Sequence, residues 1–320
     1  MPKLNMVQAI NLALKEEMER DDRVVILGED VGKDGGVFRV TEGLFEKFGP
    51  ERVMDTPLAE SSIAGAAIGM AVYGLRPVAE IQFMGFIYPA IDQIFSHAAR
   101  VRSRSRGRFS CPLVVRTPYG AGIKAPELHS ESTEALLCHM PGIKVVLPST
   151  PYTAKGLLVS SIRDPDPVIF LESTRLYRLL KEEVPEGDYT VPLGKARIAK
   201  EGNDITVIAW GSMLHRALKA AEGTGAEVID PMTLSPFDEE TILNSVKKTG
   251  RAVIVHEAPK TCGFGAELSA SIAEEAILFL KAPVLRVTGF DAVIPLARLE
   301  EHYMPTVERI RKALDEVMKY

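Results

Sequence analysis

The sequence predicts an α/β protein of two domains, each built on a mostly parallel sheet with helices on both faces. Short apolar runs rich in Val and Ile alternate with stretches of helical periodicity from one end of the chain to the other. Strands that are almost continuously apolar are typical of a parallel sheet covered on both sides. The length of 320 residues exceeds the usual size of one hydrophobic core, so two domains are expected.

The first half of the chain should contain five strands and four helices. The apolar runs predict strands at Val24–Leu27, Pro77–Ile81, Leu113–Arg116, Lys144–Leu147 and Pro167–Leu171. Helical periodicity predicts helices near Val7–Glu19, Ser61–Tyr73, Ile87–Arg102 and Thr153–Ile162.

The alternation breaks at Lys181–Gly194, a stretch with two Pro, two Gly and several charges. This composition is typical of a linker, so we expect domains at residues 1–185 and 192–320. Beyond the linker the alternation resumes, with strands expected at Ile205–Ala209, Ala226–Ile229, Ala252–His256 and Val284–Val287 and helices beginning at Met213, Asp238 and Ala266.

Composition excludes several classes of protein. The formal net charge of −5 argues against a nucleic-acid binder, which would normally be basic. No run of eighteen apolar residues occurs, so no membrane span is expected. The first residues lack the apolar core of a signal peptide, which predicts a cytoplasmic location. The three cysteines are widely spaced and fit neither a disulfide framework nor a metal motif.

The basic run Arg100–Arg108 has a two-residue spacing that does not fall on one helical face, so a solvated helix end or a subunit contact is expected there.

Glu60 is the most informative position. Pro57 ends the extended segment Val53–Thr56, and Glu60 then begins a helix lined with small residues, including Gly65 and Gly69. Small side chains let another backbone or another subunit approach closely, and glycine inside a helix costs about 1 kcal/mol against alanine. A packing reason is therefore expected. From the pattern alone, an ordinary carboxylate favoured by the helix dipole also explains Glu60.

Several long strings resemble the beta subunit of the thiamin-diphosphate-dependent, decarboxylating component of 2-oxo acid dehydrogenase complexes. They include LGEDVGKDGGVFRVTEGL (27–44), DTPLAES (55–61), RPVAEIQFMGFIYPAIDQI (76–94), LHSESTEALL (128–137) and VKKTGRAVIVHEAP (246–259). The resemblance covers residues 4 to 318 in order. It implies a transketolase-like pyrimidine-binding domain followed by a transketolase C-terminal-like domain.

The resemblance also implies a set of cofactor-binding residues. The glutamate matching Glu60 hydrogen-bonds the pyrimidine ring of thiamin diphosphate and favours the tautomer that removes the thiazolium proton. The protein supplies orientation and electrostatics, whereas the cofactor carries the carbanion chemistry. In the family that this chain resembles, residues near the cofactor match Glu29, Gln82 and Phe86. Without the resemblance, Glu29 could be a solvated turn acid and Phe86 an ordinary core aromatic.

His129 resembles a histidine that lines the active-site channel and assists acyl transfer to lipoamide. An imidazole that titrates near neutral pH suits such a proton transfer. A histidine in a loop beside Ser130 could also simply cap the following helix.

A tight turn at Asp164 and Asp166 resembles a structural potassium site in the family. The ligands implied are Asp164 and Asp166 with Leu113, Ser161 and Ile162, largely through backbone carbonyl oxygens. Oxygen ligands suit a hard monovalent cation. Turn chemistry alone also explains the alternation of Asp and Pro here.

The sequence lacks the Gly-Asp-Gly motif with which enzymes of this cofactor class hold diphosphate through Mg²⁺. It contains only Gly187-Asp188-Tyr189, inside the linker. Mg²⁺ normally meets phosphates through one or two carboxylates, so the resemblance implies that an alpha subunit holds the metal. The expected assembly is an α₂β₂ heterotetramer that contacts the subunit-binding and lipoyl domains of a lipoyl acyltransferase. The isolated chain could form a homo-oligomer through its small-residue surfaces.

The expected function is oxidative decarboxylation of pyruvate with transfer of the acyl group to lipoamide. Branched-chain 2-oxo acids are the second candidate substrate, and acetoin the third. A transketolase-like or deoxyxylulose-phosphate-synthase-like enzyme is disfavoured, since 320 residues leave no room for a diphosphate-binding domain on the same chain. A non-catalytic flavodoxin-like binding or scaffold protein is the remaining alternative.

Overall fold

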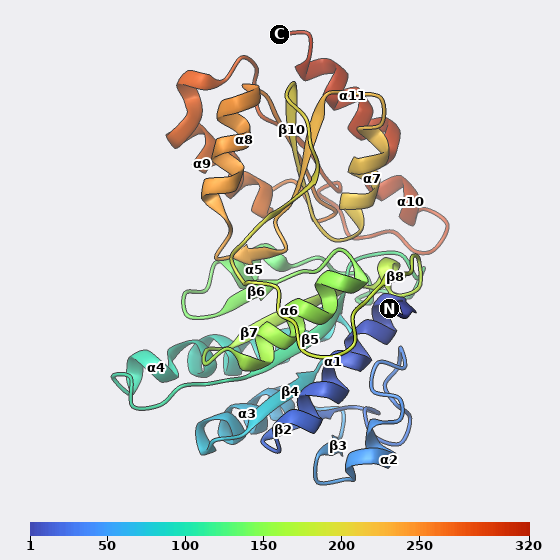
Figure 1. Ribbon diagram of the computed structural model, residues 1–320, viewed down its shortest axis with the longest axis vertical. Helices are drawn as coiled ribbons and strands as arrows, with labels where there is room; N and C mark the ends of the chain where they lie inside the picture. The colour runs from blue at the N-terminus through green and yellow to red at the C-terminus, as the bar shows by residue number, and fades with distance from the viewer.

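The computed structural model describes residues 1–320. It consists of two α/β units, each a sheet with helices on both faces, which are stacked along the longest axis of the molecule and are called the N-terminal and the C-terminal layer below (Figure 1). The N-terminal layer contains a seven-stranded sheet, which is parallel except for one edge strand. In spatial order its strands are β12 (Thr233–Ser235), β6 (Lys144–Val146), β7 (Val168–Ser173), β5 (Val114–Tyr119), β4 (Arg76–Glu80), β2 (Val24–Gly28) and β3 (Val53–Asp55).

Helices cover both faces of this sheet, as its apolar strands require. On one face α1 (Met6–Arg20) and α6 (Pro151–Arg163) pack against each other and against buried strand residues. The other face is covered by α3 (Glu60–Tyr73), α5 (Glu134–Cys138) and the segment that follows β4. The short α2 (Leu44–Phe48) buries Leu44 against the α1 side. The fold class expected for the first half is therefore confirmed, with strand ends that differ by a few residues.

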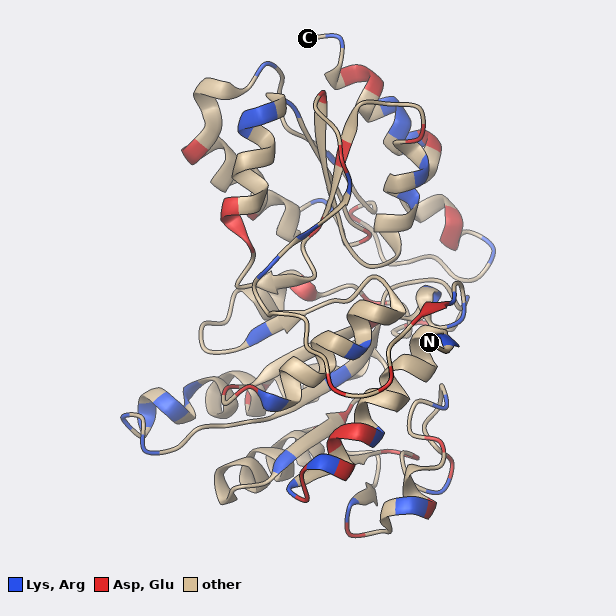
Figure 2. Ribbon diagram, viewed as in Figure 1, with Lys and Arg blue, Asp and Glu red and all other residues tan.

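The single helix expected over Ile87–Arg102 is wrong in detail. The chain instead forms a 3₁₀ helix at Met84–Ala90, a π turn at Gln93–His97, a 3₁₀ turn at Ala98–Arg100 and α4 (Val101–Arg104). Pro89 lies inside the first piece and has no N–H to donate, which favours departures from α geometry. The basic run ends in the protruding, exposed tip beyond α4 (Figure 2).

The C-terminal layer is a five-stranded sheet with helices on both faces. In spatial order its strands are β14 (Leu285–Val287), β13 (Ala252–Val255), β10 (Ile205–Ala209), β11 (Ala226–Asp230) and β9 (Arg197–Lys200), and only β9 is antiparallel. One face packs on α7 (Ser212–Ala220) and α11 (Val307–Val317), and the other on α8 (Glu239–Thr249) and α9 (Phe264–Ala276). Asp238 caps α8 by accepting a hydrogen bond from the Thr241 N–H at 3.2 Å, as its position before two glutamates predicts.

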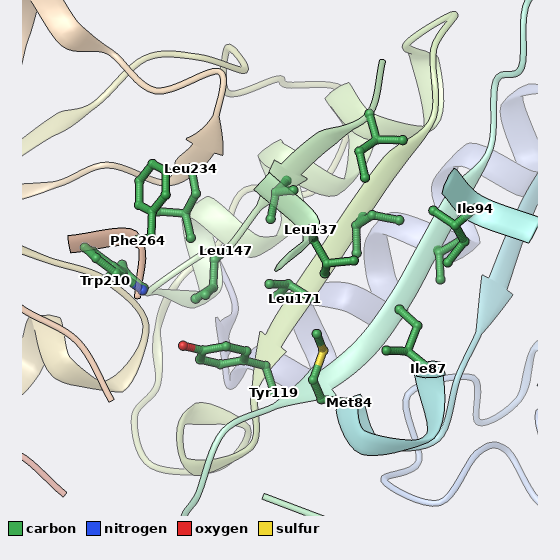
Figure 3. Close-up of a cluster of buried hydrophobic side chains, with 14 of the residues drawn as sticks. Met84, Ile87, Ile94, Tyr119, Leu137, Leu147, Leu171, Trp210, Leu234 and Phe264 are labelled. Atoms are coloured by element: carbon green, nitrogen blue, oxygen red, sulfur yellow. The ribbon is translucent and has the colours of Figure 1, made fainter. Parts of the chain in front are cut away.

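One of the buried hydrophobic clusters extends across the boundary between the two layers. Strand β12 lies in the second half of the chain but pairs with β6 of the first sheet. Trp210 and Phe264 of the C-terminal layer lie in the same buried cluster as Leu147 of the N-terminal layer (Figure 3). We propose the division of the chain at residues 185–192 with β12 as an exception that crosses it.

The remaining elements are short. Strands β1 (Lys3–Leu4) and β8 (Glu182–Glu183) pair antiparallel and tie the linker to the N-terminus. A 3₁₀ turn (Ile277–Phe279) and α10 (Glu300–Tyr303) lie between α9 and α11 in the chain. All three cysteines are free. None of the helices has the length and apolar character needed to cross a bilayer.

Candidate active site

The candidate site lies where the parallel strands of the first sheet end. Chains that leave the carboxyl ends of parallel strands bring their side chains to one edge, and ligands of such sheets bind there. Glu29 directly follows β2, and Gln82 follows β4 by two residues. Glu60 is the first residue of α3, which follows the neighbouring strand β3. The fold thus brings these three predicted residues to the same edge.

Glu29 and Glu60 form a pair of nearly buried carboxyls, with exposed fractions of 8% and 9%. Burial raises the pKa of Glu29, and the nearby charges of Glu60, Asp30 and Glu80 raise it further. Gly28, the last residue of β2, permits the close approach of the end of β4, since a Cβ there would lie 2.8 Å from the Glu80 carbonyl oxygen. The site therefore concentrates negative charge where a carboxyl can hold a proton.

An aromatic cluster is formed by Phe83 and Phe86, on the segment after β4, and by His129, on the loop between β5 and α5. The His129 ring centroid is 4.4 Å from that of Phe83 and 5.0 Å from that of Phe86. The two phenylalanine rings meet edge to face at 5.5 Å. The Ser61 hydroxyl, next to Glu60, donates to the Pro89 carbonyl at 2.5 Å and joins the start of α3 to this segment.

His129 is held in one orientation by its own loop. Its Nδ1 lies 2.8 Å from the Glu127 carbonyl oxygen. A carbonyl only accepts hydrogen bonds, so Nδ1 carries the proton and Nε2 is left for other partners. The loop approaches Gly85 so closely that a Cβ there would lie 2.2 Å from the Leu128 carbonyl oxygen. Only glycine fits at that position.

Gln82 links two strand ends. Its side-chain Nε2 donates to an Asp30 carboxylate oxygen at 3.1 Å. Asp30 itself adopts a left-handed backbone conformation, with φ of 57°. The amide of Gln82 is thus engaged within the protein and joins the loop after β4 to the loop after β2.

A buried ion cluster beneath the site was missed by the sequence analysis. Arg116 is 1% exposed and donates from Nε and Nη2 to the two oxygens of Glu172, both at 2.7 Å. The same guanidinium also pairs with Glu80, whose pKa burial raises. Tyr177 donates its hydroxyl to Glu172 at 2.7 Å. Charged residues inside otherwise apolar strands, such as VVRTPY and VIFLES, were the available signal.

The five residues of the predicted potassium turn lie at the opposite edge of the same sheet. The carbonyl oxygens of Ile162 and Asp164 both approach Nη1 of Arg76, at 2.7 and 3.4 Å. The remaining ligand candidates also have partners within the chain. The carboxylates of Asp164 and Asp166 accept hydrogen bonds from Lys144 and Arg102. The Leu113 carbonyl accepts from the Val168 N–H, and the Ser161 hydroxyl donates to the Leu157 carbonyl. No group of three or more His, Cys, Asp or Glu side chains is arranged to hold a metal ion. This turn is therefore separate from the carboxyl and aromatic site.

Both halves of the chain match known domain families. Residues 2–179 match the transketolase pyrimidine-binding domain, and residues 194–310 match the transketolase C-terminal domain. A solved chain described as a split gene transketolase, inactive beta4 tetramer, aligns with a TM-score of 0.80 and 25% identity over 99% of both chains. The fold is thus that of a two-domain transketolase-like protein.

Curated relatives narrow the class further. The chain is 52% identical to the pyruvate dehydrogenase E1 component subunit beta of Acholeplasma laidlawii, over 99% of this chain and 98% of that protein. It is 50% identical to the protein of the same name from Bacillus subtilis, over the full length of both. This chain belongs to the family of pyruvate dehydrogenase E1 component beta subunits. The resemblance inferred from the sequence is confirmed.

Proposed function

We propose that this chain is the beta half of a thiamin-diphosphate-dependent enzyme that decarboxylates pyruvate and passes the acyl group to lipoamide. The observation that carries the proposal is the pair of buried carboxyls, Glu29 and Glu60, together with the half-buried Phe86 and His129. The segment that carries Phe86 is joined to the start of α3 by the hydrogen bond from Ser61 to Pro89. The full-length identity to relatives named pyruvate dehydrogenase supports pyruvate over the branched-chain 2-oxo acids and acetoin.

The residues present fit the pyrimidine half of thiamin diphosphate. When bound, this cofactor supplies the carbanion chemistry. Glu60 would exchange a proton with the pyrimidine ring nitrogen, and the exclusion of water from this buried carboxyl strengthens that hydrogen bond. The ring of Phe86 would pack against the pyrimidine, whereas Glu29 and Gln82 would shape the pocket. A general acid–base contribution of this kind is worth roughly 10²–10⁴ in rate.

His129 would act in the acyl-transfer step. Its Nδ1–H is committed to the Glu127 carbonyl, so Nε2 is the atom that exchanges a proton with the lipoamide thiol. Hydrogen bonding at one ring nitrogen fixes the tautomer and the orientation of the other.

The diphosphate and Mg²⁺ would be held by an alpha subunit. The surface of α3 supports such a partner, because a Cβ at Gly69 would meet no atom of this chain within 4 Å. The neighbouring Ala66 is exposed, and Tyr73 is 91% exposed. Packing within the chain thus gives no reason for this glycine, and close approach of another subunit does. We propose the α₂β₂ heterotetramer, with a homo-oligomer for the chain alone, since the split gene transketolase chain is described as a beta4 tetramer.

The split gene transketolase also corrects one argument from length. A transketolase that is divided between genes need not carry its diphosphate-binding domain on the chain that resembles this one, so 320 residues do not exclude that activity. The stronger support for pyruvate is quantitative: 50–52% identity to the pyruvate dehydrogenase subunits against 25% to the split transketolase chain.

We also propose K⁺ at the turn formed by Leu113, Ser161, Ile162, Asp164 and Asp166, bound through backbone carbonyls rather than carboxylates. Two carbonyl oxygens of this turn already converge on the charge of Arg76. The two carboxylates are paired with Lys144 and Arg102 instead. A melting temperature that rises in KCl, but not in NaCl of equal concentration, would support this site, and equal melting temperatures would contradict it.

Co-expression with the cognate alpha chain tests the main proposal. The purified complex should decarboxylate pyruvate when supplied with thiamin diphosphate and Mg²⁺. It should also acylate a lipoyl domain of the acyltransferase that is supplied with its lipoyl group in the disulfide form, because opening of that disulfide accepts the two electrons released when the aldehyde-level intermediate becomes an acyl group. The beta chain alone should do neither. Turnover by the isolated chain, or transfer of two-carbon units between sugar phosphates by the complex, would contradict the proposal.

A further inference from the structure

The segment from 119 to 131 joins β5 to α5 and carries His129. It contains no helix or strand beyond Tyr119, the last residue of β5. The Gly120 N–H donates to the Glu131 carbonyl at 2.9 Å and closes the neck of the loop. Something other than secondary structure must therefore hold the rest of the segment.

Two carboxylates of the C-terminal layer provide that support. The Ala121 N–H donates to Oε2 of Glu257 at 3.0 Å, and the Lys124 N–H donates to Oε2 of Glu300 at 3.2 Å. Glu257 lies two residues beyond the end of β13, and Glu300 is the first residue of α10. Hydrogen bonds from backbone N–H groups to a carboxylate are among the stronger ones in proteins.

The Glu257 carboxylate lies close to the backbone of residues 120–121. Glu257 is 2% exposed, and its other oxygen accepts a hydrogen bond from the Ser212 hydroxyl at 3.2 Å. Gly120 has φ of +78°, and a Cβ at this position would lie 2.5 Å from the Glu257 carboxylate. Both the backbone conformation and the space at residue 120 therefore require glycine.

The far end of the same segment reaches the candidate active site. The Leu128 carbonyl packs on Gly85, and the His129 ring packs on Phe83 and Phe86. One continuous loop thus joins the buried carboxylate of the C-terminal layer to the histidine of the N-terminal layer.

We propose that Glu257 is a positioning residue for acyl transfer, which acts by anchoring the 119–131 segment to the C-terminal layer and so fixing His129 in the channel. Glu300 provides the second anchor. The inference rests on the proposed function, because it concerns the step in which His129 meets lipoamide. It assigns to the C-terminal layer a role inside the active site in addition to its part in packing.

The test compares two partial reactions of the complex with the alpha subunit. Decarboxylation is followed with an artificial electron acceptor, and acyl transfer is followed as acylation of a lipoyl domain. Glu257→Ala should lower kcat for acylation at least tenfold, change decarboxylation less than twofold and leave the KM for pyruvate unchanged. Glu257→Gln, which keeps an oxygen acceptor for Ala121, should recover acylation to within about threefold of wild type.

Asp230→Ala is the matched control. Asp230 is also buried in the C-terminal layer and also bonds to the N-terminal layer, accepting from the Ser149 hydroxyl at 2.9 Å. It does not touch the 119–131 segment, so both partial reactions should remain in their wild-type ratio. Trypsin should cut after the exposed Lys124 faster in Glu257→Ala than in Asp230→Ala. If Glu257→Ala does not fold, Glu300→Ala should give the same selective loss.

The outcomes separate the inference from the proposed function. Wild-type acylation by Glu257→Ala, or an equal loss of both partial reactions in Glu257→Ala and in Glu257→Gln, would overturn the anchoring role. A wild-type complex that neither decarboxylates pyruvate nor acylates a lipoyl domain would overturn the proposed function instead.

Discussion

Arg116 and Glu172 form a two-point ion pair inside the first sheet, with both nitrogen–oxygen distances at 2.7 Å and neither side chain more than 1% exposed. Strands β5 and β7, which carry them, are direct neighbours. The pair lies beneath the strand ends that form the candidate site. The strands below the site are therefore joined by a buried ion pair, in a region where apolar residues are usual.

Removing one member of this cluster should be costly. Arg116→Ala leaves Glu80 and Glu172 buried without a counter-charge, and breaking a buried pair typically costs about 3–5 kcal/mol. Urea unfolding should show that loss. Arg23→Ala, which removes a 59% exposed partner of Asp21, should cost far less, because exposed ion pairs contribute little to stability. Equal effects of the two substitutions would show that the buried cluster is not a stabilising element.

Glu60→Ala should abolish decarboxylation while leaving assembly with the alpha subunit intact. The side chain begins α3 and supports no strand, so its loss removes chemistry rather than fold. The measurement is pyruvate decarboxylation together with sedimentation of the complex. Glu46→Ala, which removes an exposed glutamate of α2, should behave as wild type. Full activity of Glu60→Ala would contradict the role assigned to this carboxyl.

His129→Ala should slow acylation of the lipoyl domain more than it weakens cofactor binding. The imidazole is held through Nδ1 by the Glu127 carbonyl, which leaves Nε2 for the proton transfer. Loss of a general acid–base group typically costs roughly 10²–10⁴ in rate. Isothermal titration with thiamin diphosphate and single-turnover acylation would separate the two effects. A large loss of cofactor affinity with unchanged acylation would contradict this assignment.

The stability of the protein should fall between pH 7 and pH 8. Burial raises the pKa of Glu134 to about 8. In the unfolded chain this group loses its proton near its ordinary pKa, so above that value the folded state binds more protons than the unfolded state. Stability then decreases as the pH rises, until the folded carboxyl also ionises near pH 8. The decrease from this group between pH 7 and 8 is about 1 kcal/mol.

Glu134→Gln should flatten that part of the pH profile, because the amide does not titrate. Two other buried acids, Glu257 and Asp230, have pKa values raised to about 7 and about 6. They lower stability over a lower pH range and remain in the variant. Urea unfolding at pH 6, 7 and 8 measures the difference. An identical slope in wild type and variant between pH 7 and 8 would contradict the raised pKa of Glu134.

Gly69→Leu should leave the isolated chain folded and prevent its assembly with the alpha subunit. A side chain at this position meets open space within the chain, and leucine favours a helix over glycine by up to about 1 kcal/mol. The melting temperature of the isolated chain, measured at a concentration at which it is monomeric, should therefore stay the same or rise. Analytical ultracentrifugation with the alpha chain should show separated subunits. Glu274→Leu, on α9 of the other layer, is the control, and it should still assemble.

The two-layer α/β fold and the family were both predictable from the order of the residues. Apolar runs such as Val24–Leu27 and Ile205–Ala209 are long enough to specify buried parallel strands, because both faces of such strands must be apolar. The family was identified from short sequence motifs, including DTPLAES around Glu60, that resemble those of its members. The cap at Asp238 was also predictable, because capping depends on a few adjacent residues.

How distant segments meet was visible in the folded chain alone. The return of β12 to the first sheet, the cluster around Arg116 and the anchoring of Ala121 by Glu257 each join residues that are far apart in the chain. Local periodicity contains no information about such pairs. Their physical basis is long range: a buried charge or an unpaired strand edge is stable only when the fold supplies its partner.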